Sequence, residues 1–126
     1  MIKQYIFLRE DLPKNIFKTS GTIITQACHC VTAVIFKYIE SNEYKLTIKS
    51  YLSNLKEMTK VVLKLDIDEL KELESELNEK NIGYFLWNED SEDVCIATVP
   101  LDVNNSDKGI ILKDISKKYK LFNKKI

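Results

Sequence analysis

Short clusters of β-branched, aliphatic and aromatic residues alternate along the chain with polar stretches, and their lengths fit strands. The run from Val61 to Leu65 is the clearest, because an acidic segment with helical periodicity follows it at once. The predicted strands cover residues 2–10, 59–65, 83–87 and 94–99, and residues 120–122 could add a short one. We expect the last two main strands to form a pair, because only the polar loop 88–93 separates them.

Four longer segments carry apolar residues three or four positions apart, the spacing of a helix with one buried side. The predicted helices cover residues 22–39, 43–56, 66–80 and 108–122. Thr19 or Ser20 fits the N-cap of the first, and Asp66 with Glu69 fits a capping box at the start of the third. The expected inward positions are Leu70, Leu73 and Leu77 in the third helix and Ile111, Ile115 and Tyr119 in the last.

The order strand, helix, helix, strand, helix, strand, strand, helix predicts an α/β fold with a mixed sheet and helices on its faces. A length of 126 residues, 44% of them hydrophobic, fits one domain spanning residues 1–126. Nineteen basic residues balance nineteen acidic ones, so contact with nucleic acid or membrane would need local patches. No apolar run reaches the length of a signal-peptide core or a membrane span, and we therefore expect a cytoplasmic protein without membrane contact.

The only histidine, His29, lies between Cys28 and Cys30, yet these side chains do not converge on a helix. The two cysteines are about 160° apart at the helical rotation per residue, whereas helix residues that share a metal ion are three or four apart. His29 does not face either neighbour, which argues against a nucleophile with its base. We expect both cysteines to be core or near-core residues and predict no metal site.

A polar row remains in the same helix. Thr22, Gln26 and His29 line one side, and the row begins in the first turn, where free N–H groups and the helix dipole favour negative charge. The opposite, apolar side is expected to hold Ile23, Ile24, Ala27, Val31, Val34, Ile35 and Tyr38. The row could be a site, or Gln26 and His29 could be solvated helix residues, and periodicity alone does not decide.

Five ordered segments resemble the archaeal and eukaryotic type II peptidyl-tRNA hydrolase family. They are "IKQYIFLREDL", "GTIITQACHCVTA", "MTKVVLKL", "ELNEKNIGYFLWNED" and "VCIATVP", which together span nearly the whole chain. The similarity is greatest to the eukaryotic peptidyl-tRNA hydrolase domain-containing proteins, where the segments at residues 26–29 and 86–89 recur. The resemblance implies a three-layer α/β sandwich, with a mixed sheet of four or five strands and helices on both faces.

The resemblance also implies a function. Family members cleave the ester between a peptide, or an N-blocked aminoacyl group, and the ribose at the tRNA 3′ end, without a metal or other cofactor. Carried over to this chain, water would attack the ester with help from His29 or Glu89, and Gln26 and Thr22 would lie near the developing oxyanion. The implied substrate-binding residues, which would meet peptidyl-tRNA or tRNA, are Lys18, Lys60, Lys64 and Arg9.

Two departures from the family pattern leave a second function open. Thr22 replaces the usual lysine, and a shorter acidic loop replaces the family's Asp-Ala-Gly-Arg-Thr, with Glu89 at the position of the aspartate. Glu89 could act in catalysis or be one more solvated carboxylate, and Glu92 with Asp93 would repel phosphate. The alternative is a weak or inactive family member that binds tRNA or protein. A homodimer that uses exposed apolar surface at Trp87 or Tyr38 is a third option.

Overall fold

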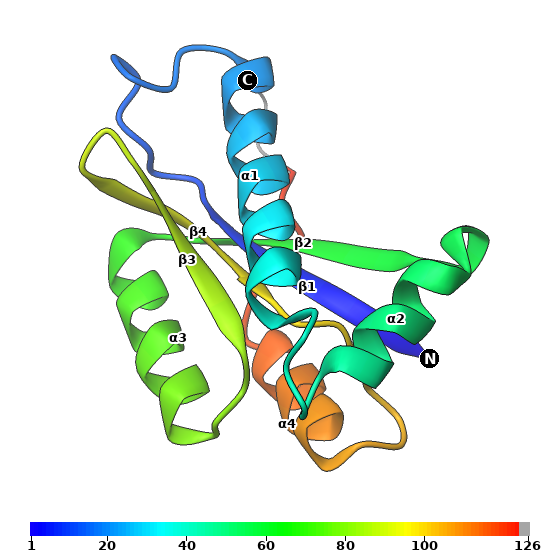
Figure 1. The fold of residues 1–126 in the computed structure, drawn as a ribbon. Coiled ribbons are helices and arrows are strands. Elements are labelled where there is room, and N and C mark those ends of the chain that lie inside the picture. The colour runs from blue at the N-terminus through cyan, green and yellow to red at the C-terminus, as the bar shows by residue number, and fades with distance from the viewer. Residues whose placement is uncertain (124–126) are drawn as a thin grey trace.

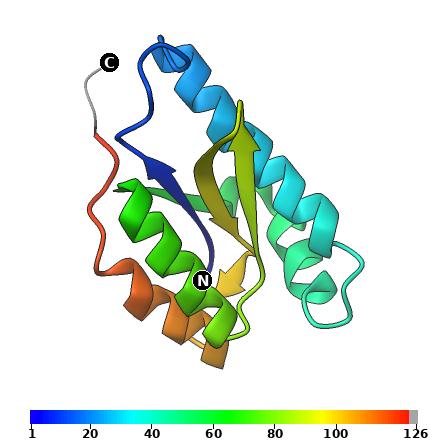
Figure 2. The same cartoon turned by 90° about the vertical axis from the view of Figure 1, so that its left-hand side faces the viewer.

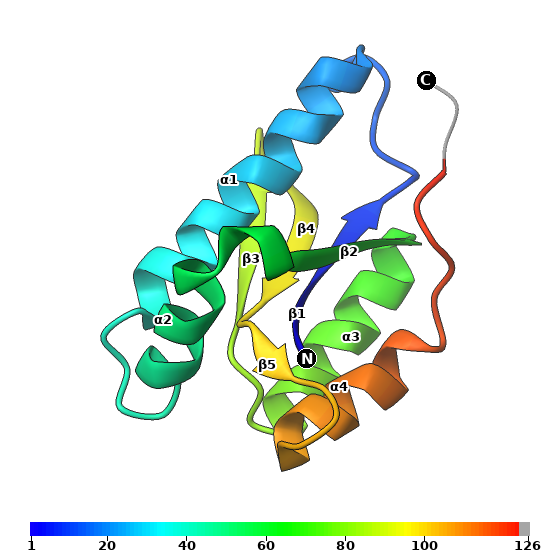
Figure 3. The same cartoon turned by 90° about the vertical axis from the view of Figure 1, so that its right-hand side faces the viewer.

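The computed structural model describes residues 1–123 and folds them into a five-stranded sheet between two helical layers (Figure 1). Figure 3 places α1 and α2 on one face of the sheet and α3 and α4 on the other, and Figure 2 views this sandwich from the opposite side. The strands are β1 (Ile2–Arg9), β2 (Thr59–Leu65), β3 (Tyr84–Glu89), β4 (Glu92–Thr98) and β5 (Leu101–Asp102). The helices are α1 (Ser20–Tyr38), α2 (Lys45–Ser53), α3 (Ile67–Glu79) and α4 (Asp107–Ser116). The predicted three-layer α/β sandwich is confirmed.

The sheet is mixed, as predicted. Its order is β2-β1-β4-β3, with β5 also paired to β1. β1 runs parallel to β2 and antiparallel to β4, and β3 and β4 form an antiparallel hairpin. β1 is buried from Gln4 to Arg9 and β4 from Val94 to Thr98, because both strands lie inside the sheet and helices cover both faces.

The helix starts follow the sequence signals. Thr19 is the N-cap of α1, and its side chain accepts a hydrogen bond from the main-chain N–H of Thr22. Asp66 and Glu69 form the predicted capping box of α3. The inward-facing leucines of α3 are almost fully buried, as expected; they are Leu70, Leu73 and Leu77.

Gly109 brings the first turn of α4 close to β5. A Cβ atom at this position would lie 1.9 Å from the carbonyl oxygen of Asp102. No real side chain tolerates that distance, so only glycine lets this helix approach the strand so closely. Ser106 caps the same turn by accepting a hydrogen bond from the Gly109 N–H.

Two predicted helix ranges are wrong at their ends. α2 covers Lys45–Ser53 rather than residues 43–56, and a separate 3₁₀ turn follows at Leu55–Glu57. α4 ends at Ser116 rather than at residue 122, so Tyr119 lies beyond the helix. The chain leaves the helix because residues 120–122 run antiparallel along β2, with main-chain hydrogen bonds of 2.9 Å at both ends of the segment. The short strand expected there is a single bridge, between Leu63 and Leu121.

The acidic loop expected at residues 88–93 is instead a tight hairpin. Asp90 and Ser91 have φ values of 51° and 65°, and they alone connect β3 to β4. Two successive residues with positive φ are typical of the two-residue turn that matches the twist of paired strands. The strands therefore extend further than predicted, and Glu89 pairs with Glu92 at their ends.

Candidate active site

Two threonine hydroxyl groups form hydrogen bonds at the start of α1. Thr22 donates its main-chain N–H to Thr19 Oγ1 over 3.1 Å, and the two side-chain oxygens lie 2.9 Å apart. The first turn holds no acidic residue. It therefore keeps free main-chain donors and the positive end of the helix dipole at the surface, although no cation accompanies them at position 22.

Gln26 is buried rather than solvated, which corrects one of the two expectations for the polar row. Its side chain is 4% exposed. Its Oε1 accepts a hydrogen bond of 3.0 Å from Trp87 Nε1, and its Nε2 donates over 3.1 Å to the carbonyl oxygen of Thr22. The buried amide is therefore satisfied by one strand residue and by its own helix, and these two bonds fix its position.

His29 completes the polar row against the same tryptophan. Its ring stacks on Trp87, with centroids 4.8 Å apart and planes 21° apart, and its side chain is exposed. Trp87 thus contacts Gln26 through its indole N–H and His29 through its ring face. The three residues form one cluster, which we call the tryptophan cluster.

Glu89 follows Trp87 by two positions on β3. Side chains two apart on a regular strand share a face, which would put Glu89 on the side of the sheet that α1 covers, and Glu89 lies directly before the hairpin turn. The β3–β4 ladder shifts its register between Trp87 and Asn88. Its carboxylate has no hydrogen bond or ion pair within residues 1–123. β3 thus carries Glu89 two positions beyond Trp87, whose contacts hold the Gln26 amide and the His29 imidazole against the strand.

Only one of the two helix cysteines is buried. Cys30 is fully buried, and its Sγ lies 3.3 Å from the carbonyl oxygen of Phe85 and 3.5 Å from that of Cys95. Cys28 is exposed, so the expectation of a core or near-core position is wrong for it. Burial raises the pKa of the Cys95 thiol well above its ordinary value, and the adjacent Cys30 thiol raises it further. Cys30 and Cys95 are packing residues.

The buried side of α1 is rotated relative to the expected one. Ile24 is 59% exposed, although it was expected among the apolar contacts. The residues that α1 buries are Ile23, Gln26, Cys30 and Val34. Gln26 lies on this buried side, where it accepts the indole N–H of Trp87.

Trp87 and Tyr38, the residues considered for a dimer surface, are both half-buried. Trp87 belongs to the tryptophan cluster, and Tyr38 packs edge-on against Tyr44 with ring centroids 5.4 Å apart. Other apolar side chains are much more exposed, led by Phe36 at 84% and Leu46 at 74%.

Arg9 is buried among acidic groups rather than open to a ligand. Its side chain is 5% exposed, with Nε 2.9 Å from Asp11 Oδ1 and a terminal nitrogen 2.8 Å from Glu92 Oε2. Burial alone would lower the pKa of Arg9, but its bonds to Asp11 and Glu92 raise it above the ordinary value. Asp11 also accepts the N–H of Ile67 at the start of α3 over 3.2 Å. Arg9 thus ties β1, the β3–β4 hairpin and α3 together, and it pairs the charge of Glu92 that was expected to repel phosphate.

The three lysines expected to meet tRNA lie in different environments. Lys18 is exposed directly before the cap of α1, and Lys64 on β2 lies 3.5 Å from Glu10. Lys60 donates to Gln4 Oε1 over 2.7 Å and to the Tyr51 hydroxyl over 3.2 Å. Burial lowers the pKa of Lys60. Of the three, only Lys18 adjoins the helix terminus that begins the polar row.

The contacts of Trp87 and Arg9 are what sequence reasoning missed. A tryptophan in a strand needs an acceptor for its N–H, and a glutamine in the facing helix is a suitable one, so the pair had a recognisable chemical signal. The partners of Arg9 had none, because Glu92 is 83 positions away and reaches it only through the hairpin. Within residues 1–123 no group of three or more histidine, cysteine or acidic side chains could hold a metal ion.

The structure is a three-layer α/β domain in which Gln26 and His29 of α1 lie against Trp87 of β3. The chain belongs to the peptidyl-tRNA hydrolase PTH2 family, whose family model matches residues 2–121. It is similar to the human protein named "Putative peptidyl-tRNA hydrolase PTRHD1" and to the mouse protein of the same name. Each is 38% identical over 104 residues, which cover 79% of this chain and 71% of the relative. No helix in the described part of the chain is long and apolar enough to cross a membrane.

Proposed function

We propose that the protein hydrolyses the ester that joins a peptide, or an N-blocked aminoacyl group, to the ribose at the 3′ end of tRNA. The observation that carries the proposal is the tryptophan cluster, in which a hydrogen bond of 3.0 Å and a ring stack hold Gln26 and His29 against β3. Membership of the PTH2 family supports the substrate class. Fixed positions for an amide and an imidazole are what catalysis of acyl transfer requires.

The reaction needs one proton acceptor and one proton donor. The oxygen of a water molecule bonds to the ester carbonyl carbon while its proton passes to Glu89 or His29. The bond between that carbon and the ribose oxygen then breaks, and the ribose oxygen receives a proton. Glu89 is suited to accept because no described residue within hydrogen-bonding distance competes for its carboxylate, and His29 is suited to both steps because it is exposed.

The N-terminal end of α1 would stabilise the negative charge that develops on the carbonyl oxygen. Its N-terminal N–H groups point toward the surface, and one hydrogen of Gln26 Nε2 remains after the bond to the Thr22 carbonyl. The hydroxyl of Thr22 lies in the same turn. These donors are neutral, so the stabilisation depends on their orientation.

Contact with the tRNA phosphates is assigned to Lys18, which is exposed and adjoins that helix terminus directly. Lys64 is half-buried on β2 and lies 3.5 Å from Glu10, so it adds less charge. We assign Arg9 and Lys60 positioning roles instead. The donors of Arg9 are taken by Asp11 and Glu92, and the ammonium group of Lys60 holds the buried Gln4.

A second candidate is a family member that binds tRNA or protein without turnover. The observation that favours it is position 22, where a threonine whose hydroxyl faces Thr19 replaces a cation. This function would keep the surface of the site but lack the charge that stabilises an oxyanion.

Hydrolysis of a purified N-acetyl-aminoacyl-tRNA and a tetrapeptidyl-tRNA distinguishes the two functions. We expect the wild type to release both acyl groups, and His29→Ala and Glu89→Gln each to lower kcat by at least about 100-fold. Thr32→Ala, an exposed change on α1, is the matched control and should retain full activity. Binding of tRNA without release at any enzyme concentration would establish the second candidate.

A further inference from the structure

The two edges of the sheet differ. β2 forms one edge, and residues 120–122 cover it with main-chain hydrogen bonds. β3 forms the other edge, and no strand in the described part of the chain pairs with its outer side. Strand edges of this kind are where extended peptides bind by adding a strand.

The phase of the β3–β4 ladder identifies which groups of β3 face outward. Val99 donates its N–H to the carbonyl oxygen of Gly83 over 3.0 Å, so the Gly83 carbonyl faces β4, while the Gly83 N–H donates to the Tyr44 hydroxyl over 3.0 Å. Antiparallel ladders alternate, and the main-chain groups of Tyr84 and Leu86 therefore point away from β4. The Tyr84 carbonyl accepts a weak bond of 3.4 Å from the Tyr38 hydroxyl, while the N–H and carbonyl of Leu86 have no partner within residues 1–123.

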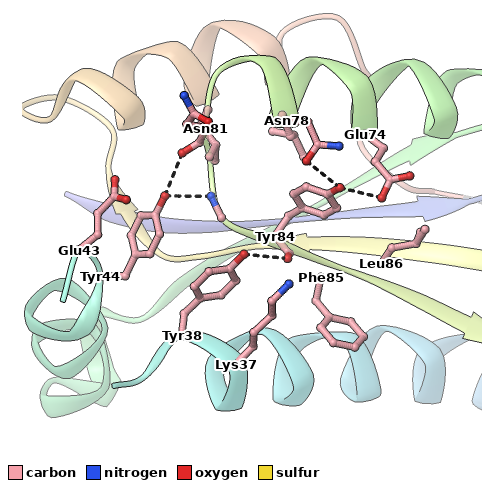
Figure 4. A pocket seen from close by; sticks show the side chains of 13 residues that line it. Lys37, Tyr38, Glu43, Tyr44, Glu74, Asn78, Asn81, Tyr84, Phe85 and Leu86 are labelled. Atoms are coloured by element: carbon pink, nitrogen blue, oxygen red, sulfur yellow. Dashed lines mark hydrogen bonds between the residues drawn. The ribbon is translucent and has the colours of Figure 1, made fainter. Parts of the chain in front are cut away.

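A groove of about 520 Å³ lies along this edge (Figure 4). Lys37 and Tyr38 of α1 form one wall, and Glu74 and Asn78 of α3 form the other, with β3 between them. The Nζ atom of Lys37 lies 5.2 Å from the ring centroid of Tyr38 and 5.9 Å from that of Phe85. The walls thus offer aromatic surface and hydrogen-bonding groups on either side of the strand.

We propose that this groove holds the peptide of peptidyl-tRNA as an added strand, paired with Tyr84 and Leu86 of β3. The inference rests on the proposed function. β3 leads from the groove to the tryptophan cluster, and Glu89 lies about 10 Å beyond Leu86 at the usual rise per strand residue. A peptide of a few residues therefore reaches from the groove to the candidate active site.

The position of the ester sets the direction of the peptide. The ester is at the C-terminal residue of the peptide, and the candidate catalytic residues lie at the C-terminal end of β3. The peptide therefore runs parallel to β3. Recognition through main-chain groups depends on peptide length and tolerates any sequence, as a substrate that carries arbitrary peptides demands.

Two measurements test the groove. The first compares kcat/KM for N-acetyl-aminoacyl-tRNA and for N-acetyl-tetrapeptidyl-tRNA with the same C-terminal residue. We expect the longer substrate to be favoured by about tenfold, because it adds main-chain hydrogen bonds. Leu86→Pro removes the outward N–H and should bring the ratio to about one. Leu86→Ala loses the side chain but keeps the N–H, and it should preserve the preference.

The second measurement needs no variant and no hydrolysis. N-acetyl-tetra-alanine amide is added to the ¹⁵N-labelled wild type, and we expect the amide signals of Tyr84 and Leu86 to shift more than that of Phe85, which faces β4. This measurement tests whether the groove binds an extended peptide even if Leu86→Pro does not fold.

The outcomes separate the groove from the proposed function. Shifts at Tyr84 and Leu86 without hydrolysis of either substrate would keep the groove and overturn the hydrolase. Hydrolysis of both substrates at equal rates, with no shifts, would overturn the groove alone. Shifts at the same two amides that depend on protein concentration without peptide would mean that a second copy occupies the edge, and would also overturn it.

Discussion

The indole N–H of Trp87 donates to Gln26 Oε1 over 3.0 Å and so joins the edge strand β3 to the second turn of α1. Gln26 would otherwise be a buried amide without a partner for its oxygen. The bond thus has a structural role, and it also sets where the free hydrogen of the Gln26 amide points. We therefore expect removal of this hydrogen bond to lower both the free energy of unfolding and the rate of hydrolysis.

Trp87→Phe keeps a ring beside His29 but removes the donor to Gln26. We expect the free energy of unfolding to fall by about 1–3 kcal/mol, since the buried Oε1 loses its partner. When Gln26→Leu is already present, Trp87→Phe should lower the free energy of unfolding by less, because that background has no buried Oε1 that needs a hydrogen-bond donor. A double-mutant cycle by urea denaturation measures the difference, and additive effects would contradict a coupled pair.

Thr22→Lys restores a cation at the first turn of α1. If the remaining site is competent, we expect kcat/KM for peptidyl-tRNA to rise by at least about tenfold, because a charged group can stabilise the oxyanion or a phosphate. Thr25→Lys adds the same charge three positions along an exposed part of the helix and serves as the control. An equal gain in both variants would point to general attraction of tRNA.

Stability should depend on pH through Asp11. Burial alone would raise its pKa, but the hydrogen bond from Arg9 and that from the Ile67 N–H lower it below the ordinary 3.8. Since the folded state holds this proton less tightly than the unfolded chain, Asp11 stabilises the fold above about pH 4. That contribution is lost as the pH falls through the folded-state pKa. Urea denaturation at several pH values between 6 and 2 gives the free energy of unfolding as a function of pH. This free energy should fall less over that range in Asp11→Asn than in the wild type or in the control Asp90→Asn.

Gly109→Ala tests the close approach of α4 to β5. The new Cβ would lie 1.9 Å from the Asp102 carbonyl oxygen, so the helix must shift. We expect a loss of about 1–3 kcal/mol in the free energy of unfolding. Gly21→Ala, where the nearest atom is 3.8 Å away, should be neutral or stabilise by up to about 1 kcal/mol. A free energy of unfolding that changes equally in both variants would contradict a specific role for the contact between Gly109 and Asp102.

Local patterns predicted the elements well because each signal acts within a few residues. The capping box at Asp66 and the leucines of α3 depend on neighbours along one helix. The end of α4 was missed because main-chain partners on β2 compete with helical hydrogen bonds, and these partners are distant in sequence.

The sequence proposed the members of the candidate site, which stay a prediction, but it did not give their geometry. Periodicity assigned Gln26 to a polar side, and the structure buries it with its side-chain oxygen bonded to Trp87. Arg9 was expected at the substrate, yet Asp11 and Glu92 surround it once the hairpin forms. Both cases depend on contacts between elements, which hydrophobic spacing does not encode.

The segment 120–122 along β2 limits how chains of this protein can assemble. A sheet with two open edges can add copies on both sides and grow into a fibre. Here residues 120–122 occupy main-chain groups of β2 that another chain would need, so addition of copies at that edge is disfavoured. Within residues 1–123 the edge of β3 remains open, and pairing between copies through it would favour dimers over fibres.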